Sequence, residues 1–462
     1  MGLLPRFRRR PPPLDPSFGQ LLGDLQGPVA RISAKGDIAT LDRSWQLEWG
    51  VRAGTSWKRA AQETAVRQGR VDDAPVYETW MRVPGGDVIQ RVGVINSGSG
   101  RALMVEYENA SPNAVVVATV GSGVGPVSAE LSGVRLDGVC WIRPSVDAGA
   151  VAVGKDIWAQ LDDEPDDASV VGDGSIAMLV PLPHRQTISV TVTIDGDGKM
   201  RPVAPAEIAA GWRAVTADAL SVEVPDTDLE AAWRRVVGDL VLAAGSDDPI
   251  VVGEAAWWLD LAGLPVEADR ARANLLTVAD RSRLEPDAAV VALRALASRE
   301  LRQGRASALG EIAGPLVKLA GDHLDRDTAR IVARALASEA PGAAADAAAL
   351  AEHCLVDARP MVSPVASGAE RVLGHLFCDA DLTEQIEMLP SVPEAWFGQP
   401  IDVRGMVTGL GTLSFSVRWH GDRPAVLWER IGGPENTTLT CRGLDPAWSS
   451  TERSGEALLA AP

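Results

Sequence analysis

The sequence predicts a multidomain α and β protein with an N-terminal antiparallel β-sandwich, a central array of αα-hairpins and a short C-terminal β-module. Two observations predict this class. Short segments rich in Val, Ile and Thr fill residues 20–214, whereas Ala- and Leu-rich segments with helical spacing fill residues 225–389. After Pro390 the strand pattern returns. We therefore expect a disordered, basic and Pro-rich tail over residues 1–19, and domains at 20–214, 225–389 and 390–462.

The N-terminal region has the sequence pattern of a large β-sandwich. Residues 187–194, TISVTVTI, alternate apolar and polar side chains, which gives a strand one buried and one solvated face. The following Asp195-Gly196-Asp197-Gly198 is a turn signal. It is not an EF-hand loop, because the position where that loop needs a glutamate holds Ala206. About 190 residues of short strands with frequent turns predict a β-sandwich.

The central region predicts helix after helix with short connections. Asp226 or Thr227 can cap a first helix that carries Trp233 and Leu240 on one face. Further helices are expected at 249–262, 266–279, 287–303, 306–320, 325–340, 343–353, 366–377 and 382–388. Consecutive helices with short joints form αα-hairpins, which stack here as a shortened toroid or an arc. No fixed-period consensus indicates a solenoid repeat.

The C-terminal region contains three strand patterns at residues 412–419, 424–429 and 437–441. About 60 residues form a meagre independent core. We therefore expect this module to pack against the rest of the protein.

Composition and charge exclude several function classes. A formal net charge of −18 and a pI of about 4.8 argue against nucleic-acid binding, which needs clustered Lys and Arg. The chain has no apolar run of about 18 residues, so integral membrane association is not expected. Arg6 to Arg10 lead into prolines rather than an apolar stretch, which differs from a signal peptide. The four widely spaced cysteines agree with a cytoplasmic location.

Metal and cofactor motifs are also missing from the sequence. The five histidines and four cysteines are scattered without zinc spacing. The glycines at 121, 123 and 125 lead into Pro126 rather than a helix, so they do not form a dinucleotide cradle. No Walker lysine motif and no GxSxG elbow occur. We expect no metal and no cofactor, and nothing in the sequence identifies a protein partner.

The domain order and two groups of motifs carry a family resemblance. The closing text includes Trp419-His420-Gly421, residues 423–429 (RPAVLWE) and residues 443–450 (GLDPAWSS); the N-terminal domain adds residues 82–87 (RVPGGD) and 106–112 (EYENASP). The chain resembles uncharacterised actinobacterial proteins related to the six-hairpin glycosidase group of glucoamylase-like and maltose-phosphorylase-like enzymes. The resemblance implies an acid and a base on helix connections and an α-glucan or oligosaccharide ligand. The helical region is about half the length of that group's twelve-helix toroid, which counts against both acids being present.

Glu254 and Asp260 are the candidate catalytic acids, with Trp257 and Trp258 beside them as candidate sugar-binding residues. On a helix, Glu254 neighbours Trp258 and Asp260 neighbours Trp257, and a carboxylate against an indole suits a sugar site. The alternative is a structural glutamate beside two core tryptophans, and we favour it. Trp428 and Trp448 in the C-terminal module are further candidate sugar-binding residues; there too we favour a structural role, and core packing or GC-rich codon usage also explains the 14 Trp.

Two hypotheses of function remain at this stage. The first is a non-catalytic binding or scaffold protein that keeps the glycosidase-like architecture. The alternative is a glycoside hydrolase or phosphorylase-like enzyme that acts on an α-glucan or oligosaccharide through a carboxylate pair. The shortened helical region and the absence of a second convincing acid favour the first. Two acids facing each other in a Trp-lined cleft would favour the enzyme, whereas a filled helical centre would favour the scaffold.

Overall fold

The computed structural model describes residues 19–460, except 43, 99, 137–139, 164, 166, 197–199, 282–283, 304–308, 338–339, 355, 358–362, 375 and 377–384. Residues 1–18 of the predicted N-terminal tail and part of the Asp195–Gly198 turn therefore lie outside the described residues. The chain divides into two compact units, one of residues 28–214 with 19–24, the other of residues 215–460 with 25–27. Within the described chain, no helix combines the length and apolar character that crossing a membrane requires.

The first unit is an antiparallel β structure, as predicted. Its strands are β1 Gln20–Asp24, β2 Gly27–Ile32, β3 Ile38–Thr40, β4 Trp45–Arg52, β5 Trp57–Arg59, β6 Arg67–Arg70, β7 Tyr77–Val83, β8 Gly86–Ser97, β9 Gly100–Asn109, β10 Val115–Glu130, β11 Gly133–Leu136, β12 Cys140–Pro144, β13 Ala150–Gly154, β14 Ser169–Leu182 and β15 Thr187–Thr193. Two helices accompany them, α1 Ile157–Asp162 and α2 Pro205–Val215, with a 3-10 turn at Ala60–Gln62.

These strands form one continuous sheet that folds over a common core. The hydrogen-bonded order runs β1-β2-β3-β4-β10-β11-β12-β15-β9-β8-β7-β6. Trp49 on β4 and Tyr107 on β9 are separated by four strands in that order, yet their ring centroids lie 5.7 Å apart. The sheet therefore closes over itself, and its two inner faces share the apolar cluster that contains Ile32, Met81 and Val190.

The two motifs quoted from this unit have structural roles. Val83 pairs with Gly86 across the β7–β8 hairpin, and Gly85 in its turn has a φ of 85°, which a residue with a side chain rarely adopts. At the end of β9, the buried Asn109 amide donates to the carbonyl oxygens of Asn113 and Leu182 at 2.8 and 3.0 Å. Both motifs thus fix strand connections.

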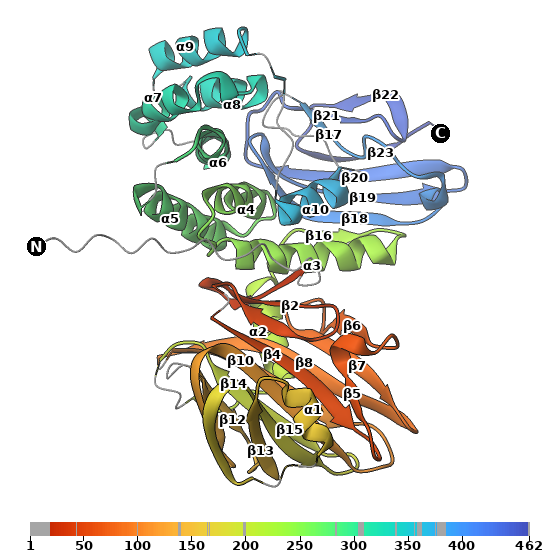
Figure 1. Ribbon diagram of the computed structural model, residues 1–462. Helices are drawn as coiled ribbons and strands as arrows, with labels where there is room; N and C mark the ends of the chain where they lie inside the picture. Colours follow the sequence, from red (N-terminus) through yellow and green to blue (C-terminus); the bar gives the residue numbers. More distant parts are fainter. Residues whose placement is uncertain are drawn as a thin grey trace, which may run out of the picture. The chain divides into compact units, whose positions relative to one another are not determined.

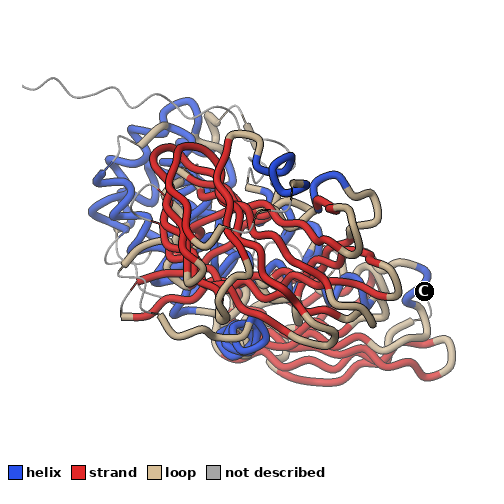
Figure 2. Tube along the Cα trace, turned by 60° about the horizontal axis from the view of Figure 1, so that its bottom comes forward, coloured by secondary structure: helices blue, strands red, loops and turns tan. Residues whose placement is uncertain are grey.

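The second unit begins with a run of helices, as predicted. They are α3 Thr227–Ala243, α4 Pro249–Leu261, α5 Pro265–Arg281, α6 Pro286–Gln303, α7 Leu309–Ala320, α8 Arg326–Leu336, α9 Pro341–Ala351 and α10 Pro364–Leu373, with a 3-10 turn at Gly321–His323. Asp226, the predicted cap, accepts hydrogen bonds from the backbone N–H groups of Asp228 and Leu229. Figure 1 shows α3 to α9 stacked in sequence, and Figure 2 draws the helices in blue and the strands in red.

The unit ends in two small sheets. Their strands are β16 Ser221–Glu223, β17 Gln385–Glu387, β18 Ile401–Thr408, β19 Gly411–His420, β20 Arg423–Ile431, β21 Thr438–Cys441, β22 Asp445–Ser450 and β23 Ser454–Leu458, with a 3-10 turn at Glu394–Trp396. One sheet has the order β16-β18-β19-β20-β23 and the other β17-β21-β22. The short strand β16 precedes the helices in sequence and pairs with β18, so it supplies part of the sheet partner that the C-terminal strands need.

One expected helix is wrong. Residues 382–388 were predicted to be helical, but residues 385–387 form β17, which pairs in parallel with β21. Gln385, Ile386 and Glu387 have one buried side chain between two more exposed ones, a strand alternation that is too short to stand out in the sequence. The remaining residues up to 384 lie outside the described part of the chain.

Candidate functional site

Helix α4 carries all four candidate residues of the helical region, and it is buried on every side. Asp248 caps its N-terminus by accepting from the N–H groups of Ile250 and Val251, and Pro249 occupies the first turn. Residues 252–261 are buried without exception. The helix packs against α3, α5, α6 and α10. A helix that is apolar all round lies at the centre of a packed layer, so its surroundings are filled by side chains.

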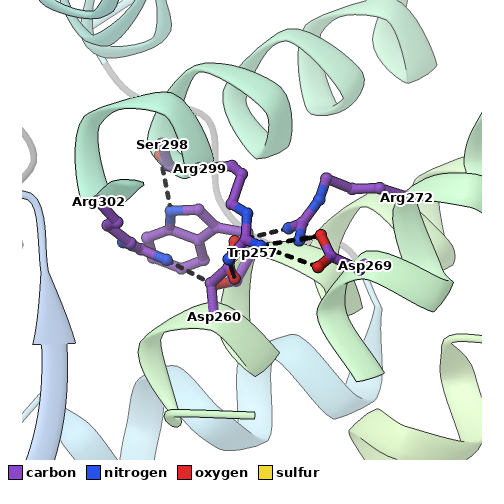
Figure 3. Close-up of polar contacts among 7 residues, drawn as sticks. All are labelled: Trp257, Asp260, Asp269, Arg272, Ser298, Arg299 and Arg302. Carbon is purple, nitrogen blue, oxygen red and sulfur yellow. Dashed lines mark hydrogen bonds and ion pairs between the residues drawn. The ribbon is translucent and has the colours of Figure 1, made fainter. Parts of the chain in front are cut away.

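Asp260 lies in a network of charges between α4, α5 and α6 (Figure 3). Its Oδ2 accepts from Arg272 Nη1 at 2.6 Å, and its Oδ1 accepts from Arg299 Nη1 at 2.8 Å. The same two arginines also bind Asp269, so two acids and two bases alternate. Burial raises the pKa of the Asp260 carboxyl, and the positive charges of Arg272, Arg302 and Arg299 oppose that effect.

The indole of Trp257 has a hydrogen-bond partner and two arginines beside its ring. Its Nε1 donates to Ser298 Oγ at 3.0 Å, and its backbone carbonyl accepts from Arg302 Nη1 at 2.9 Å. The guanidinium carbons of Arg294 and Arg302 lie 4.7 and 5.6 Å from the ring centroid. The indole is 5% exposed, so these cations occupy the surface on which a sugar would stack.

Glu254 contacts the start of another helix. The side chain is 2% exposed, and its Oε2 accepts from the backbone N–H of Ser363 at 2.9 Å. Ser363 in turn caps α10 through a bond from Ala366 N to its Oγ at 3.2 Å. The carboxylate therefore satisfies a backbone donor that the first turn of α10 leaves without a helical partner. Trp258, 4% exposed, packs edge-on against Trp257 with centroids 4.5 Å apart.

The two candidate tryptophans of the C-terminal module are in contact but differ in solvent exposure. Trp428 and Trp448 have ring centroids 5.2 Å apart at an interplanar angle of 69°. Trp428 is 7% exposed, and its Nε1 donates to the Glu452 carbonyl oxygen at 3.0 Å. Trp448 on β22 is only half-buried, so part of its surface remains accessible. The structure thus brings this pair together, and Glu254 and Asp260 lie on one helix with separate partners.

The partners of the α4 residues were not predicted from the sequence. They lie in later segments of the chain, and the sequence of α4 itself does not indicate them: Arg272, Ser298, Arg299 and Ser363. The available signal is the i,i+3 spacing of Asp269 with Arg272 and the presence of several arginines on 294–302. Among the described residues, no group of three or more His, Cys, Asp or Glu side chains could hold a metal ion.

Comparison with known proteins identifies similar folds only. No protein-family model matches the chain, and no curated protein matches it. It is similar to a bacterial glucoamylase solved with acarbose, with 9% identity and a TM-score of 0.48, covering 74% of this chain and 68% of that one. A family GH92 glycosyl hydrolase shares 12% identity at a TM-score of 0.28, over 78% of this chain and 62% of that one.

A family GH92 α-mannosidase from Bacteroides thetaiotaomicron, solved with mannoimidazole, shares 11% identity at a TM-score of 0.34, over 72% of this chain and 60% of that one. The chain thus spans less than two thirds of the two GH92 proteins. All three structures belong to glycosidases, the group that the sequence resembles.

Proposed function

We propose that this chain is a non-catalytic binding or scaffold protein of glycosidase-like architecture, located in the cytoplasm. The observation that carries the proposal is the closed environment of Asp260. Both its oxygens accept hydrogen bonds from arginines, and Arg272 is itself buried. A general acid or base must reach the substrate's proton within about 3 Å. A carboxylate engaged on both oxygens inside a packed helix layer supports a structural role instead.

Glu254 supports the same proposal. Its bond to the Ser363 N–H joins α4 to α10, and the side chain is buried among the packed helices. Hydrolysis with inversion requires two carboxylates about 6.5–9.5 Å apart with space for a water between them. Glu254 and Asp260 are six positions apart on α4, so they point in different directions from the helix axis. We infer that the pair is structural.

The ligand class that we propose is carbohydrate. Trp448 offers a partly exposed indole that is braced by the buried Trp428, and a broad apolar face with an N–H group suits stacking against a sugar. A matched control exists in Trp419, a second half-buried tryptophan of the same module, which packs against Phe397 with centroids 5.7 Å apart.

The first test is an activity screen on the full chain. Maltose, longer α-glucans and other oligosaccharides are incubated with and without phosphate, and released sugar is measured for the wild type, Glu254→Gln and Asp260→Asn. We expect no turnover by any of the three and a lower unfolding midpoint for both variants. Turnover by the wild type that drops by about two to four orders of magnitude in a well-folded Glu254→Gln would establish the glycosidase or phosphorylase alternative.

The second test addresses binding. Retardation of the native protein in gels that contain soluble α-glucans is compared for the wild type, Trp448→Ala and the control Trp419→Ala. We expect retardation that only Trp448→Ala weakens. No retardation of the wild type by any polysaccharide, or equal loss in both variants, would contradict a sugar site at Trp448.

A further inference from the structure

Arg430 is a buried cation at the end of β20 in the C-terminal module. Its side chain is 2% exposed, and its Nη1 donates to the carbonyl oxygens of Leu410 and Gly432 at 3.1 and 2.7 Å. These carbonyls belong to two turns that touch each other. A side chain at Gly433 would collide with Leu410 O, and Gly433 has a φ of 69°. Nη1 therefore links the two turns.

Among the described residues, the rest of the guanidinium has no hydrogen-bond partner. Arg430 Nε and Nη2 are both buried without a hydrogen bond, and within the described residues no other side chain has two such atoms. A guanidinium stays protonated in proteins, so Arg430 cannot escape this cost by losing its charge. A buried charge that lacks hydrogen bonds lowers the stability of the folded state. Its presence in a native fold therefore calls for an explanation.

The charged group beside Arg430 is another cation. Burial and the positive charge of Arg453 both lower the pKa of Arg430. The backbone also brings the two residues together, because Arg430 N donates to Arg453 O at 2.6 Å. In the described part of the chain, neither arginine forms an ion pair with a carboxylate. The chain has a net charge of −18, yet these two adjacent arginines have no acidic partner among the described residues.

The pair of unpartnered atoms has the geometry of a ligand site. Nε–H and Nη2–H lie along the same edge of a guanidinium and point in parallel, which is the fork that binds two oxygens of one carboxylate or phosphate. We propose that Arg430 and Arg453 form a binding site for the oxyanion of a phosphate, sulfate or carboxylate ligand. Arg430 supplies the bidentate edge, and Arg453 supplies the second positive charge.

The side chain of Arg453 makes only weak contacts with the turn at Gly432 and Gly433. Its side chain is exposed, and its bonds from Nη1 to Gly432 O and from Nη2 to Gly433 O are long, at 3.5 and 3.4 Å. Such long contacts are weak, so a bound oxyanion can replace them at little cost. The site is independent of the proposed sugar contact at Trp448 and does not require it.

The test is calorimetric titration of the full chain with inorganic phosphate, sulfate and acetate, each at constant ionic strength set with chloride. Arg453→Gln removes the second charge of the site. Arg442→Gln is the matched control, because Arg442 is 61% exposed in the same module and pairs with Glu387 at 3.7 Å. Arg430→Lys keeps the charge but removes the fork, and its folding is checked by circular dichroism.

We expect one of the three anions to bind at one site per chain. Arg453→Gln should weaken that binding about tenfold or more, since hydrogen bonds to charged groups contribute about 1.5–3 kcal/mol. Arg442→Gln should leave it within about twofold, and a folded Arg430→Lys should weaken it like Arg453→Gln. Preference for phosphate and sulfate assigns a tetrahedral ligand, and preference for acetate assigns a carboxylate.

Two results would overturn the proposal. The first is the absence of binding by all three anions at millimolar concentration. The second is an equal loss in Arg453→Gln and Arg442→Gln, which would indicate a general effect of surface charge. If Arg430→Lys does not fold, the comparison of anion binding by Arg453→Gln and Arg442→Gln decides whether the site exists.

Discussion

Asp260 and Arg430 are both buried charges of the second unit, 3% and 2% exposed, but their surroundings differ. Asp260 is bound by two arginines that in turn share Asp269. Within the described chain, the Arg430 side chain donates only to two carbonyl oxygens, and it lies beside Arg453. The first charge is balanced by charges of the opposite sign, and the second is not.

The difference separates a structural charge from a ligand-binding one. A buried carboxylate that accepts from an arginine on each oxygen has its charge partners within the fold. A buried guanidinium with a free edge and a cationic neighbour lacks the partner that its chemistry demands. A buried charge therefore indicates function only after its partners have been counted.

The largest effect on stability is expected from a substitution of Asp260, the buried charge that has partners of opposite sign. Asp260→Asn leaves Arg272 and Arg299 near one another with only the exposed Asp269 as a shared carboxylate among the described residues. Removing one partner of a buried ion pair costs about 3–5 kcal/mol, and with two arginines affected we expect the upper end, about 5 kcal/mol, in the free energy of unfolding of the second unit. Urea unfolding followed by hydrogen exchange of peptides from residues 215–460 measures it.

A triple variant distinguishes the source of this loss. Asp260→Leu with Arg272→Met and Arg299→Met removes the charges together, and buried ion networks replaced by apolar side chains of similar size are often no less stable. We expect the triple variant to recover most of the stability. A triple variant as unstable as Asp260→Asn would mean that the hydrogen bonds themselves, rather than stranded charges, stabilise the helices.

Asp37 in the first unit extends the comparison, because it is a buried acid with no hydrogen-bonded arginine among the described residues. Its Oδ2 accepts from Ser33 Oγ at 3.4 Å, and its Oδ1 is buried without a partner. Burial, followed by the negative charge of Glu48, raises the pKa of Asp37 to about 7, although Ser33, Trp49 and Arg59 act in the opposite direction. Unlike Arg430, this group can lose its charge by binding a proton.

The stability of the first unit should therefore depend on pH. Between pH 3.8, the ordinary pKa, and about 7, folded Asp37 holds a proton that the unfolded chain has released. The free energy of unfolding thus falls as pH rises through this window, by about 4 kcal/mol for a shift of about three pKa units. Asp37→Asn should remove this slope.

The measurement is the difference in unfolding free energy between the wild type and Asp37→Asn at a series of pH values from 4 to 8. The difference cancels the titration of groups that the substitution leaves alone. Asp37→Asn should become more stable relative to the wild type as pH rises. A difference that stays constant over this range would mean that Asp37 titrates near its ordinary pKa.

The order of sheet, helices and sheet could be predicted because each element carries a local signal. Asp226 and Asp248 precede apolar runs with helical spacing, and residues 187–193 alternate along β15. The three residues of β17 escaped prediction because their pairing with β21 depends on a segment more than fifty positions later in the chain. Short strands take their structure from such partners rather than from their own pattern.

The candidate site shows a similar limit. The sequence placed Glu254, Trp257 and Asp260 on one predicted helix, and all three lie on α4. It could not show that Ser298 and Arg299 from α6 and Ser363 before α10 contact them, because these contacts arise only when the helices pack. Arg430 resembles any other strand residue in the sequence, and only its burial distinguishes it.

The smallest expected effect comes from Asp269, which shares both arginines with Asp260 but is 59% exposed. Asp269→Asn removes the same charge from the same network. Because water can solvate the freed edges of Arg272 and Arg299 on this side, the loss should resemble that of an exposed ion pair, about 1 kcal/mol or less, and should shrink further in high salt. The same unfolding measurement at low and high salt checks it. A loss as large as that of Asp260→Asn would mean that the four charges act as one unit, and burial would then not be what separates the two acids.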